Sequence, residues 1–564
     1  MKINPETSSD GYKVDHKRQY PEGTQVVVSN LTSRGTRREN VDEVIFFGLQ
    51  YFMKEYLIRQ WNEDFFSKPK DVVLKRFNRR INNYLGDNKV GDQHISDLHD
   101  LGYLPISILA LPEGSLYKLR VPCLVIYNTL DKFFWLTNYL ETILSVIVWG
   151  PCTSATTAFQ FKKALTKFAL ETVGNTDFVP FQGHDFSYRG MYGMEASVMS
   201  GGAHLTSFVG TDTIPAIDWL EEYYNADSDK ELAGCSVSAT EHSVACSAIL
   251  NFVDKARGEN GTVTEDELMN LADIEYVRHL ITEVYPTGIV SIVADSFDYW
   301  NTITKTALYL KEVIMARDGK VVFRPDTGDP TRVVCGYKKF NSEFNVGEEN
   351  GADWSYDYDE ALKNNYELIQ YKNGDTYWLQ NEFLIGDVSI DELKVELTDS
   401  EIKGSIECLW DIFGGTVTDQ GYKVLDPHVG LIYGDSITFQ RANDICEGLI
   451  AKGFASTNIV FGMGSYTYQY VTRDTDAYAV KATFVRVNDK DINIYKKPKT
   501  GDGSKNSAMG IPIVLKDENG KFYMKDHGTF DELHNCELIE VFRDGQLLVD
   551  QTLAEIRERI QENV

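Results

Sequence analysis

The chain has 564 residues, of which 43% are hydrophobic and 12% aromatic, so it can bury a large core and is not an intrinsically disordered protein. Its 56 Lys and Arg residues against 84 Asp and Glu residues give a net charge of −28. This balance argues against a nucleic-acid-binding surface, because phosphate backbones need clustered cations. The eight cysteines form no C-x-x-C pair, which indicates reduced, mostly buried thiols in a cytoplasmic protein.

The first third of the chain begins with a polar segment and continues with helix-like patterns. Residues 1–17 lack an apolar core, so no signal peptide is visible. The spacing of apolar residues predicts helices over 41–57 and 154–170, and a further apolar segment covers 136–149. No stretch approaches about 18 uncharged apolar residues, so we expect no membrane span.

From about residue 180 onward, short apolar runs alternate with helix-length segments. The runs cover 288–295, 321–326, 429–435 and 458–464, and helix patterns follow at 299–315 and 439–451. Strands that are buried on both faces are continuously apolar, so the pattern predicts a parallel sheet built from βα units. We expect an irregular (β/α) barrel-like α/β domain over 179–474, with its chemistry at the carboxyl ends of the strands.

Two segments depart from this alternation of strands and helices. Residues 335–400 are acidic, rich in Tyr and Trp and contain several turn signals, which predicts a subdomain inserted at the rim of the barrel. The last part, 475–564, has short strands, an Asn519-Gly520 turn and a charged helix at its end. We expect it to join the N-terminal part, 1–178, in a separate α+β domain.

Three aspartates end successive apolar runs: Asp295, Asp326 and Asp435. Aspartate at such a position commonly caps the helix that follows. Carboxylates also suit ribose hydroxyls and magnesium, and three of them on successive strands favour a functional site. Both interpretations stand for each residue.

The fourth apolar run ends in Gly462-x-Gly464-Ser465. A tight turn explains such glycines, and so does a phosphate loop in which backbone N–H groups face the anion. A local basic run follows in this acidic chain, and it belongs either to a phosphate site or to a solvated loop. Its members include Arg473, Lys481, Lys496 and Lys505.

A further group lies between residues 186 and 243. Arg189 stands beside aromatic residues and would be costly to bury without an anionic partner, whereas Phe186 could be a plain core residue. Asp212 is an isolated carboxylate, and His242 lies among small polar residues, which favours a catalytic role over a structural one. These groups suit a flat heteroaromatic base beside an anionic sugar phosphate. The sequence lacks the Walker, H-E-x-x-H and G-x-S-x-G patterns.

These residues belong to an ordered series of motifs that covers most of the chain apart from 335–400. The series includes Asp10-Gly11-Tyr12-Lys13, Gly102-Tyr103-Leu104-Pro105, His184-Asp185-Phe186, Gly210-Thr211-Asp212-Thr213, Glu241-His242-Ser243, Arg324-Pro325-Asp326, Gly434-Asp435 and Thr472-Arg473-Asp474. In these motifs the chain resembles the nicotinamide phosphoribosyltransferases, a group within the type II phosphoribosyltransferases. The resemblance implies transfer of the phosphoribosyl group of phosphoribosyl pyrophosphate to nicotinamide in NAD biosynthesis.

The resemblance also implies a homodimer with shared active sites. Phe186 and the partner's Tyr12 should sandwich the pyridine ring. Asp212 should accept a hydrogen bond from the carboxamide and repel the carboxylate of nicotinate. Arg189 and Arg324 should hold the phosphoribosyl end.

The remaining implied roles concern ribose, phosphates and activation. Asp326, Gly434 and Asp435 should lie at the ribose, and Gly464 and Ser465 at its 5′-phosphate. The resemblance assigns cations to pyrophosphate, which carries Mg²⁺, and to the phosphates of ATP: Arg34, Arg473, Lys481, Lys496 and Lys505. It also implies that ATP phosphorylates His242 and that Asp295 orients its ring.

Two departures and two alternatives accompany this interpretation. Ala479 stands where the family often carries a serine, and Ser465 replaces a glycine.

The first alternative is a nicotinate phosphoribosyltransferase, in which a neutral or cationic group should replace Asp212. The second is a non-catalytic binding protein of the same fold. Such a protein need not retain all five of these residues: His242, Asp295, Arg324, Asp326 and Asp435.

Overall fold

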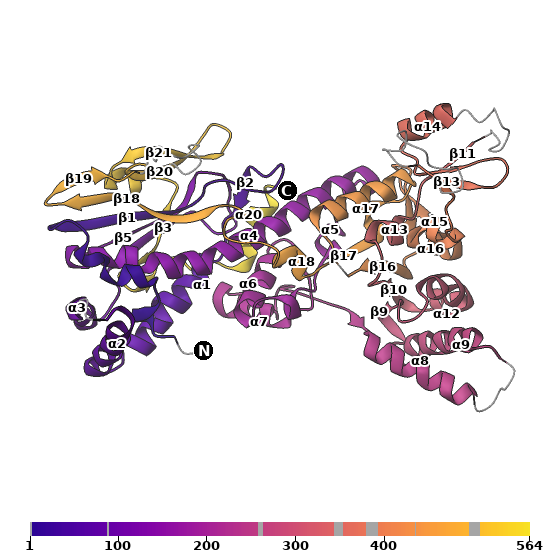
Figure 1. Ribbon diagram of the computed structural model, residues 1–564, viewed down its shortest axis with the longest axis horizontal. Helices are drawn as coiled ribbons and strands as arrows, with labels where there is room; N and C mark the ends of the chain where they lie inside the picture. The colour runs from indigo at the N-terminus through magenta and orange to yellow at the C-terminus, as the bar shows by residue number, and fades with distance from the viewer. Residues whose placement is uncertain are drawn as a thin grey trace. The chain divides into compact units, whose positions relative to one another are not determined.

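The chain forms two compact units in the computed structural model, drawn in Figure 1. The first unit comprises Met1–Gln160, Ser187–Gly234 and Tyr468–Val564, and the second comprises Phe161–Phe186 and Cys235–Thr467. The structure describes residues 3–86, 89–257, 263–342, 354–379, 393–434, 436–495 and 508–564.

An antiparallel sheet of strands from both ends of the chain organises the first unit. Its order is β19-β18-β1-β5-β3-β22-β23, so both ends of the colour bar meet in one sheet in Figure 1. The strands are β1 (Thr24–Ser33), β3 (Ile106–Ala110), β5 (Pro122–Asn128), β18 (Tyr478–Val487), β19 (Lys490–Asn493), β22 (Ile539–Arg543) and β23 (Gln546–Leu547). The two ends of the chain therefore build one α+β unit, as predicted. Its bounds differ from the predicted ones, because it also includes Ser187–Gly234 and its N-terminal segment ends at Gln160.

Helices and shorter strands complete the first unit. Its helices include η2 (Gly11–Arg18), α1 (Leu49–Tyr51), η3 (Phe52–Arg59), α2 (Lys70–Leu85), α3 (Gln93–Leu101), α6 (Met194–His204), α7 (Ile214–Tyr224) and α20 (Leu553–Gln561). Its smaller strands are β2 (Glu43–Ile45), β4 (Leu116–Lys118), β7 (Gly210–Thr211), β20 (Ile511–Lys516) and β21 (Phe522–Gly528). The tail predictions are confirmed, since β20 and β21 join through the predicted Asn519-Gly520 turn and α20 ends the chain.

The helix predicted over 41–57 is wrong in its first half. Residues 43–45 form β2, which pairs with β4, and helical structure begins at Leu49. Gly48 separates the two because its φ of 102° is left-handed, and a Cβ there would lie 2.7 Å from the ring of Pro151.

The two segments predicted over 136–149 and 154–170 form one helix, α4 (Phe134–Val173), which contains Pro151. By length and composition alone, Asp131–Val173 could cross a membrane, since its most apolar 18-residue window has a mean hydropathy of 1.3. However, 61% of its most apolar window is buried inside the protein, as is usual for the core helix of a folded domain.

A parallel sheet organises the second unit and confirms the predicted α/β fold class. Its strands follow the order β6-β17-β16-β10-β9-β8, and each neighbouring pair is parallel. They are β6 (Gly183–Asp185), β8 (Ser238–Ala239), β9 (Thr287–Val293), β10 (Asp318–Arg324), β16 (Val429–Tyr433) and β17 (Ile459–Met463). The four predicted strands are thus all present, and their carboxyl ends share one edge of the sheet.

Helices cover this sheet. They include α8 (His242–Arg257), α9 (Glu265–His279), α10 (Tyr299–Asn301), α11 (Ala307–Tyr309), α12 (Lys311–Met315), α13 (Pro330–Cys335), α16 (Ser405–Phe413), α17 (Phe439–Ala451) and α18 (Ser465–Tyr468). In Figure 1, α8 and α9 lie side by side, and α13 packs against α17. The helices predicted over 439–451 and 299–315 are both confirmed. The second consists of α10, the π-helical segment η8 (Thr302–Thr306), α11 and α12, with a turn at Leu310 between the last two.

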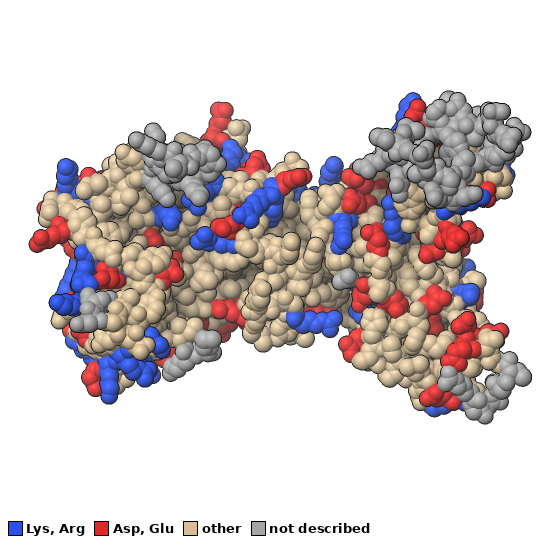
Figure 2. Space-filling view, viewed as in Figure 1, with Lys and Arg blue, Asp and Glu red and all other residues tan. Residues whose placement is uncertain are grey.

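The inserted segment has a small core of its own. Strands β11 (Lys339–Asn341), β12 (Leu368–Gln370) and β13 (Thr376–Trp378) pair beside α14 (Trp354–Lys363). Buried Ile369 and Tyr377 belong to this core. In the space-filling view of Figure 2, acidic and basic side chains are interspersed over the visible face.

Candidate active site

Asp295 lies two residues after the end of β9 and is the centre of the first candidate site, in the second unit. Its side chain is 2% exposed. Its carboxylate accepts hydrogen bonds from Nε2 of His242 (3.1 Å), the backbone N–H of Asp326 (3.0 Å) and the hydroxyl of Thr327 (2.9 Å). The His242 side chain is 46% exposed, so Asp295 fixes the ring through Nε2 and leaves Nδ1 to other groups.

The helix caps near the strand ends are other residues. The side chain of Asp298 caps α10 and that of Asp329 caps α13, each by accepting a backbone hydrogen bond. Asp295 and Asp326 precede these caps by three residues each. The capping interpretation therefore does not account for either aspartate.

Arg324 ends β10 with a side chain that is only 12% exposed. Its Nη2 donates to the carbonyl of Thr240 at 2.6 Å, and its Nε lies 4.0 Å from Oδ1 of Asp326. The Nε is buried and has no hydrogen-bond partner among the described residues. A guanidinium with an unused buried donor is suited to an anion that binds from outside the chain.

Phe186 follows β6 and shares its space with two glycines. A Cβ at Gly462 would lie 2.6 Å from the Phe186 ring and 2.5 Å from Cα of Gly434. A Cβ at Gly434 would lie 3.1 Å from Oδ1 of Asp326. Only glycine at 462 lets the ring lie this close to the strand ends. The second unit thus combines a flat apolar face with a carboxylate, and we call His242, Asp295, Arg324, Asp326 and Phe186 the strand-end site.

The predicted phosphate loop follows β17. Gly464 and Ser465 are half-buried, and Ser465 is the first residue of α18. A Cβ at Gly464 would meet no atom within 4 Å, so its backbone has open space around it. Asp435, Lys496 and Lys505 lie outside the described residues.

Arg189 and Asp212 are exposed and lie in the first unit. Asp212 directly follows β7, and the chain before it is anchored by a histidine that the sequence did not single out. His204 bonds through Nε2 to the carbonyl of Gly210 (3.0 Å) and through Nδ1 to the hydroxyl of Tyr468 (2.6 Å). Because Nε2 faces a carbonyl, it carries the proton and Nδ1 accepts from Tyr468.

The first unit also contains a cavity of about 430 Å³, which we call the basic pocket. Its charged and aromatic lining residues are Asp10, Tyr12, Lys13, His16, Glu141, Trp149, Arg473 and Lys481. Tyr12 is 66% exposed at this pocket. These residues come from η2, from the first half of α4 and from the chain around the start of β18.

A buried ion pair lines the basic pocket. Nζ of Lys13 lies 2.7 Å from the carboxylate of Glu141, and their side chains are 7% and 9% exposed. The same carboxylate accepts from Ser29 (2.7 Å) and from the amide of Asn138 (3.2 Å). Glu141 is thereby saturated with donors, which a buried carboxylate needs.

The other cations of the pocket are less well compensated. Arg473 pairs with Asp474 at 3.2 Å, but both side chains are more than half exposed, at 53% and 56%. Desolvation lowers the pKa of Lys481, although the side chain as a whole is exposed, and nearby Arg34, Lys13 and Arg473 lower that pKa further against the opposing effect of Glu141. The Nε of Arg34 is buried without a hydrogen-bond partner among the described residues. Cations that repel one another around a cavity favour a bound anion.

Sequence reasoning missed several residues of these sites. Lys13 and His16 are three residues apart on one face of η2, and this spacing could have been noticed in the sequence. No sequence pattern identifies Glu141, His204 or Thr327. Among the described residues no group of three or more His, Cys, Asp or Glu could hold a metal ion.

The chain is similar to known proteins over its whole length. The family model described as the nicotinate phosphoribosyltransferase (NAPRTase) family matches residues 181–534, and that of the nicotinamide phosphoribosyltransferase N-terminal domain matches 4–108. A nicotinamide phosphoribosyltransferase of Acinetobacter baylyi is 43% identical over 100% of this chain and 98% of its own length. Proteins of the same name from Xanthomonas campestris pv. campestris and Mycoplasma pneumoniae are 30% and 28% identical, over 98% and 89% of this chain and 96% and 93% of their own lengths.

Proposed function

Because the chain belongs to the nicotinate phosphoribosyltransferase family, we propose that it transfers the phosphoribosyl group of phosphoribosyl pyrophosphate to nicotinamide. The products are nicotinamide mononucleotide and pyrophosphate. The observation that carries the proposal is the strand-end site, where the Phe186 ring lies against glycines beside Asp326 and near the buried guanidinium of Arg324. The Phe186 ring suits a pyridine ring, Asp326 suits ribose hydroxyls and Arg324 suits a phosphate.

The chemistry needs positioning and charge stabilisation more than proton transfer. The pyridine nitrogen attacks the anomeric carbon and the bond to pyrophosphate breaks, so the nitrogen needs no general base because it carries no proton. Asp326 accepts hydrogen bonds from the ribose, and Arg324 offers its unused donor to the phosphoribosyl group. The transition state is oxocarbenium-like, and its leaving group is stabilised by cations.

The basic pocket supplies cations for a polyphosphate, either pyrophosphate or the phosphates of ATP. Magnesium supplies charge neutralisation when it enters with pyrophosphate, and we assign it no protein ligands. Arg473 and Lys481 reach the phosphates from the pocket wall, and Arg34 adds a third cation. The excess of positive charge described above supports this role.

ATP is proposed to phosphorylate His242. The exposed ring, which Asp295 holds through Nε2, supports this role because a phosphoryl donor can approach Nδ1 from solvent. The enzyme works as a cytoplasmic homodimer, and the 66% exposure of Tyr12 fits a ring that serves the partner's site. Asp212 accepts a hydrogen bond from the carboxamide N–H₂ group and thereby selects nicotinamide over nicotinate.

The experiment that tests the function measures nucleotide formation from phosphoribosyl pyrophosphate with each pyridine. The wild type should use nicotinamide, and Asp212→Ser should weaken this use by about ten- to a hundredfold, the value of a hydrogen bond to a charged group. The same change should relax the exclusion of nicotinate. The matched control is Asp218→Ser, six residues further along on the exposed face of α7. A wild type that prefers nicotinate would support the alternative, and one that consumes neither pyridine would contradict both.

A further inference from the structure

Two loops carry arginines that act electrostatically on Lys481 of the basic pocket. Residues 34–38 follow β1 and residues 472–477 precede β18, and the two strands pair so that Ser33 lies opposite Tyr478. The first loop carries Arg34 and the second carries Arg473. Both arginines, with Lys13, lower the pKa of Lys481, so four cations gather here and repel one another.

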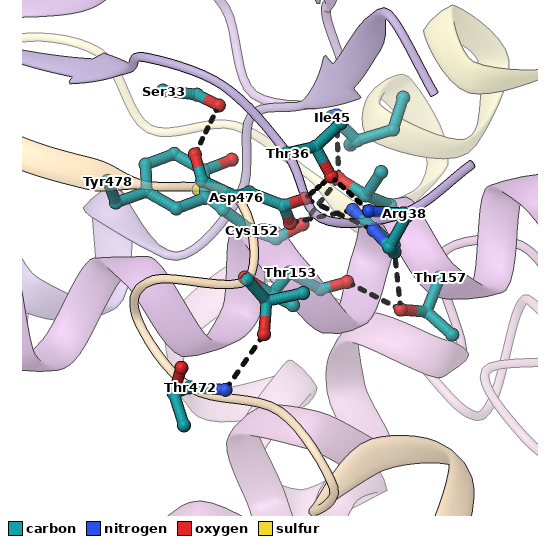
Figure 3. A network of polar contacts seen from close by, with 12 residues as sticks. Ser33, Thr36, Arg38, Ile45, Cys152, Thr153, Thr157, Thr472, Asp476 and Tyr478 are labelled. Atoms are coloured by element: carbon teal, nitrogen blue, oxygen red, sulfur yellow. Dashed lines mark hydrogen bonds and ion pairs between the residues drawn. The ribbon is translucent and has the colours of Figure 1, made fainter. Parts of the chain in front are cut away.

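A buried carboxylate ties these loops together (Figure 3). The side chain of Asp476 is 0% exposed and accepts from Arg38 in a two-pronged arrangement, from Nε at 3.1 Å and from Nη2 at 2.6 Å. It also accepts from the hydroxyl of Thr36 at 2.9 Å. The Nη1 of Arg38 donates to the hydroxyl oxygen of Thr157 on α4 at 3.2 Å, so the pair of Arg38 and Asp476 is also anchored to this helix.

The backbone of the second loop is shaped by the same contacts. Ser33 donates to the carbonyl of Asp476 at 2.7 Å, and the N–H of Arg37 donates to the carbonyl of Thr475 at 2.8 Å. The N–H of Tyr478 returns to the carbonyl of Arg473 at 3.1 Å, which closes the loop on itself. Ala477 adopts a left-handed φ of 49°, a conformation that surrounding contacts must hold.

Asp476 and Arg38 do not line the basic pocket, whereas Arg473 does. We propose that Arg38 and Asp476 are positioning residues for the basic pocket: their buried pair holds loop 472–477 against loop 34–38 so that Arg473 faces the bound polyphosphate. This inference rests on the proposed function, because it takes pyrophosphate as the ligand of the pocket. A two-pronged arginine–carboxylate pair suits the task, since it fixes orientation as well as distance.

Asp476→Asn is the direct test. The amide keeps the size of the side chain but turns an N–H₂ group toward the donors of Arg38. We expect the dissociation constant of inorganic pyrophosphate, measured by calorimetry, and the KM for phosphoribosyl pyrophosphate to rise by about tenfold or more. The KM for nicotinamide should stay unchanged. Arg38→Lys keeps the positive charge but loses the two-pronged hydrogen bond to Asp476, so it should weaken pyrophosphate binding to a smaller extent. If Asp476→Asn does not fold, this variant tests the positioning role in its place.

A double-mutant cycle separates positioning from a general structural effect. If Asp476 acts through Arg473, adding Asp476→Asn to Arg473→Ala should weaken pyrophosphate binding no further. The matched control is Asp491→Asn, which breaks another two-pronged pair, that of Arg486 and Asp491, whose aspartate is 54% exposed. This control should leave pyrophosphate binding unchanged.

The outcomes distinguish the inference from the function on which it rests. A wild type that binds no pyrophosphate and forms no nucleotide overturns both. A wild type that binds pyrophosphate, with Asp476→Asn and Arg38→Lys binding it equally well, overturns the positioning role alone. Losses that add fully in the Arg473→Ala background also overturn it, because Asp476 then acts by another route.

Discussion

In the strand-end site, charged groups meet because parallel strands end side by side, whereas in the basic pocket they meet because buried ion pairs hold distant segments together. Asp295 joins the ends of two neighbouring strands, β9 and β10, through bonds to the chain around Asp326. Lys13, Glu141 and Arg473 come instead from three separated segments. The first arrangement follows from the topology of the sheet, and the second depends on a few individual side chains.

The two regions also differ in how deeply their charges are buried. In the strand-end site each pair joins a buried side chain to a more exposed one: Asp295 is 2% exposed and His242 46%, and Arg324 is 12% exposed and Asp326 33%. In the basic pocket the pair of Lys13 and Glu141 is less than 10% exposed. Loss of the Glu141 charge should therefore destabilise the fold, because it leaves Lys13 buried and unpaired. Loss of the Asp295 charge should mainly lower activity, because the partner left behind, His242, is exposed.

The largest expected effect is that of Glu141→Gln on stability. The change leaves the ammonium of Lys13 buried without its counter-charge, so the free energy of unfolding should fall by about 3 kcal/mol. Chemical denaturation at neutral pH measures this difference. The control is Asp491→Asn in the exposed pair with Arg486, which should cost about 1 kcal/mol or less. Equal losses in the two variants would remove the distinction between buried and exposed pairs.

Next in size is the effect of Asp295→Asn on activity. An amide cannot accept from all three donors that meet the carboxylate, so the His242 ring and the loop at Asp326 lose their common anchor. We expect kcat/KM to fall by about ten- to a hundredfold. Asp298→Asn is the control, because asparagine still caps α10 and should leave kcat/KM unchanged. If Asp295→Asn and Asp298→Asn lose activity equally, Asp295 affects activity only by stabilising the fold.

The same contrast explains how much of each site could be predicted from sequence. Asp295 and Asp326 end apolar runs, and parallel topology brings such ends together, so their proximity was predictable. The sequence could not reveal that Gly462 makes room for Phe186, because that requires the ring's placement. The ion pair of Lys13 and Glu141 was also hidden, since it joins η2 to α4 across more than a hundred residues.

The fold was predictable to a similar extent. Strands β9, β10, β16 and β17 were predicted because strands buried on both faces are continuously apolar. The antiparallel sheet of the first unit was not traced strand by strand, because its partners come from opposite ends of the chain. The start of the helix near Leu49 was misplaced because Gly48 turns the backbone against Pro151, a contact that no local pattern announces.

A smaller effect is expected from His242→Ala. If this residue is the phosphoacceptor, ATP should lower the apparent KM for nicotinamide in the wild type by about fivefold or more and should not do so in the variant. Basal activity without ATP should survive, because substrate positioning comes from other residues. His279→Ala, which changes an exposed histidine paired with Glu283, should respond to ATP like the wild type. Activation of His242→Ala by ATP would leave the residue without a phosphoacceptor role.

The smallest expected effect concerns pH and Lys481. The pKa of Lys481 lies below the usual lysine value, first because of desolvation and then because Arg34, Lys13 and Arg473 surround it. Its ammonium is therefore fully present at low pH and is lost as pH rises through this lowered pKa, so its contribution to pyrophosphate affinity should fade in the same direction. Lys481→Arg keeps the charge, because a guanidinium does not titrate in this range. The affinity ratio of this variant to the wild type should rise between about pH 7 and pH 10 by less than about tenfold, and taking the ratio cancels the ionisation of pyrophosphate itself. Lys490→Arg on the exposed β19 should show a flat ratio. A flat ratio for Lys481→Arg as well would mean that Lys481 does not contact the bound anion, and the basic pocket would then rest on its arginines alone.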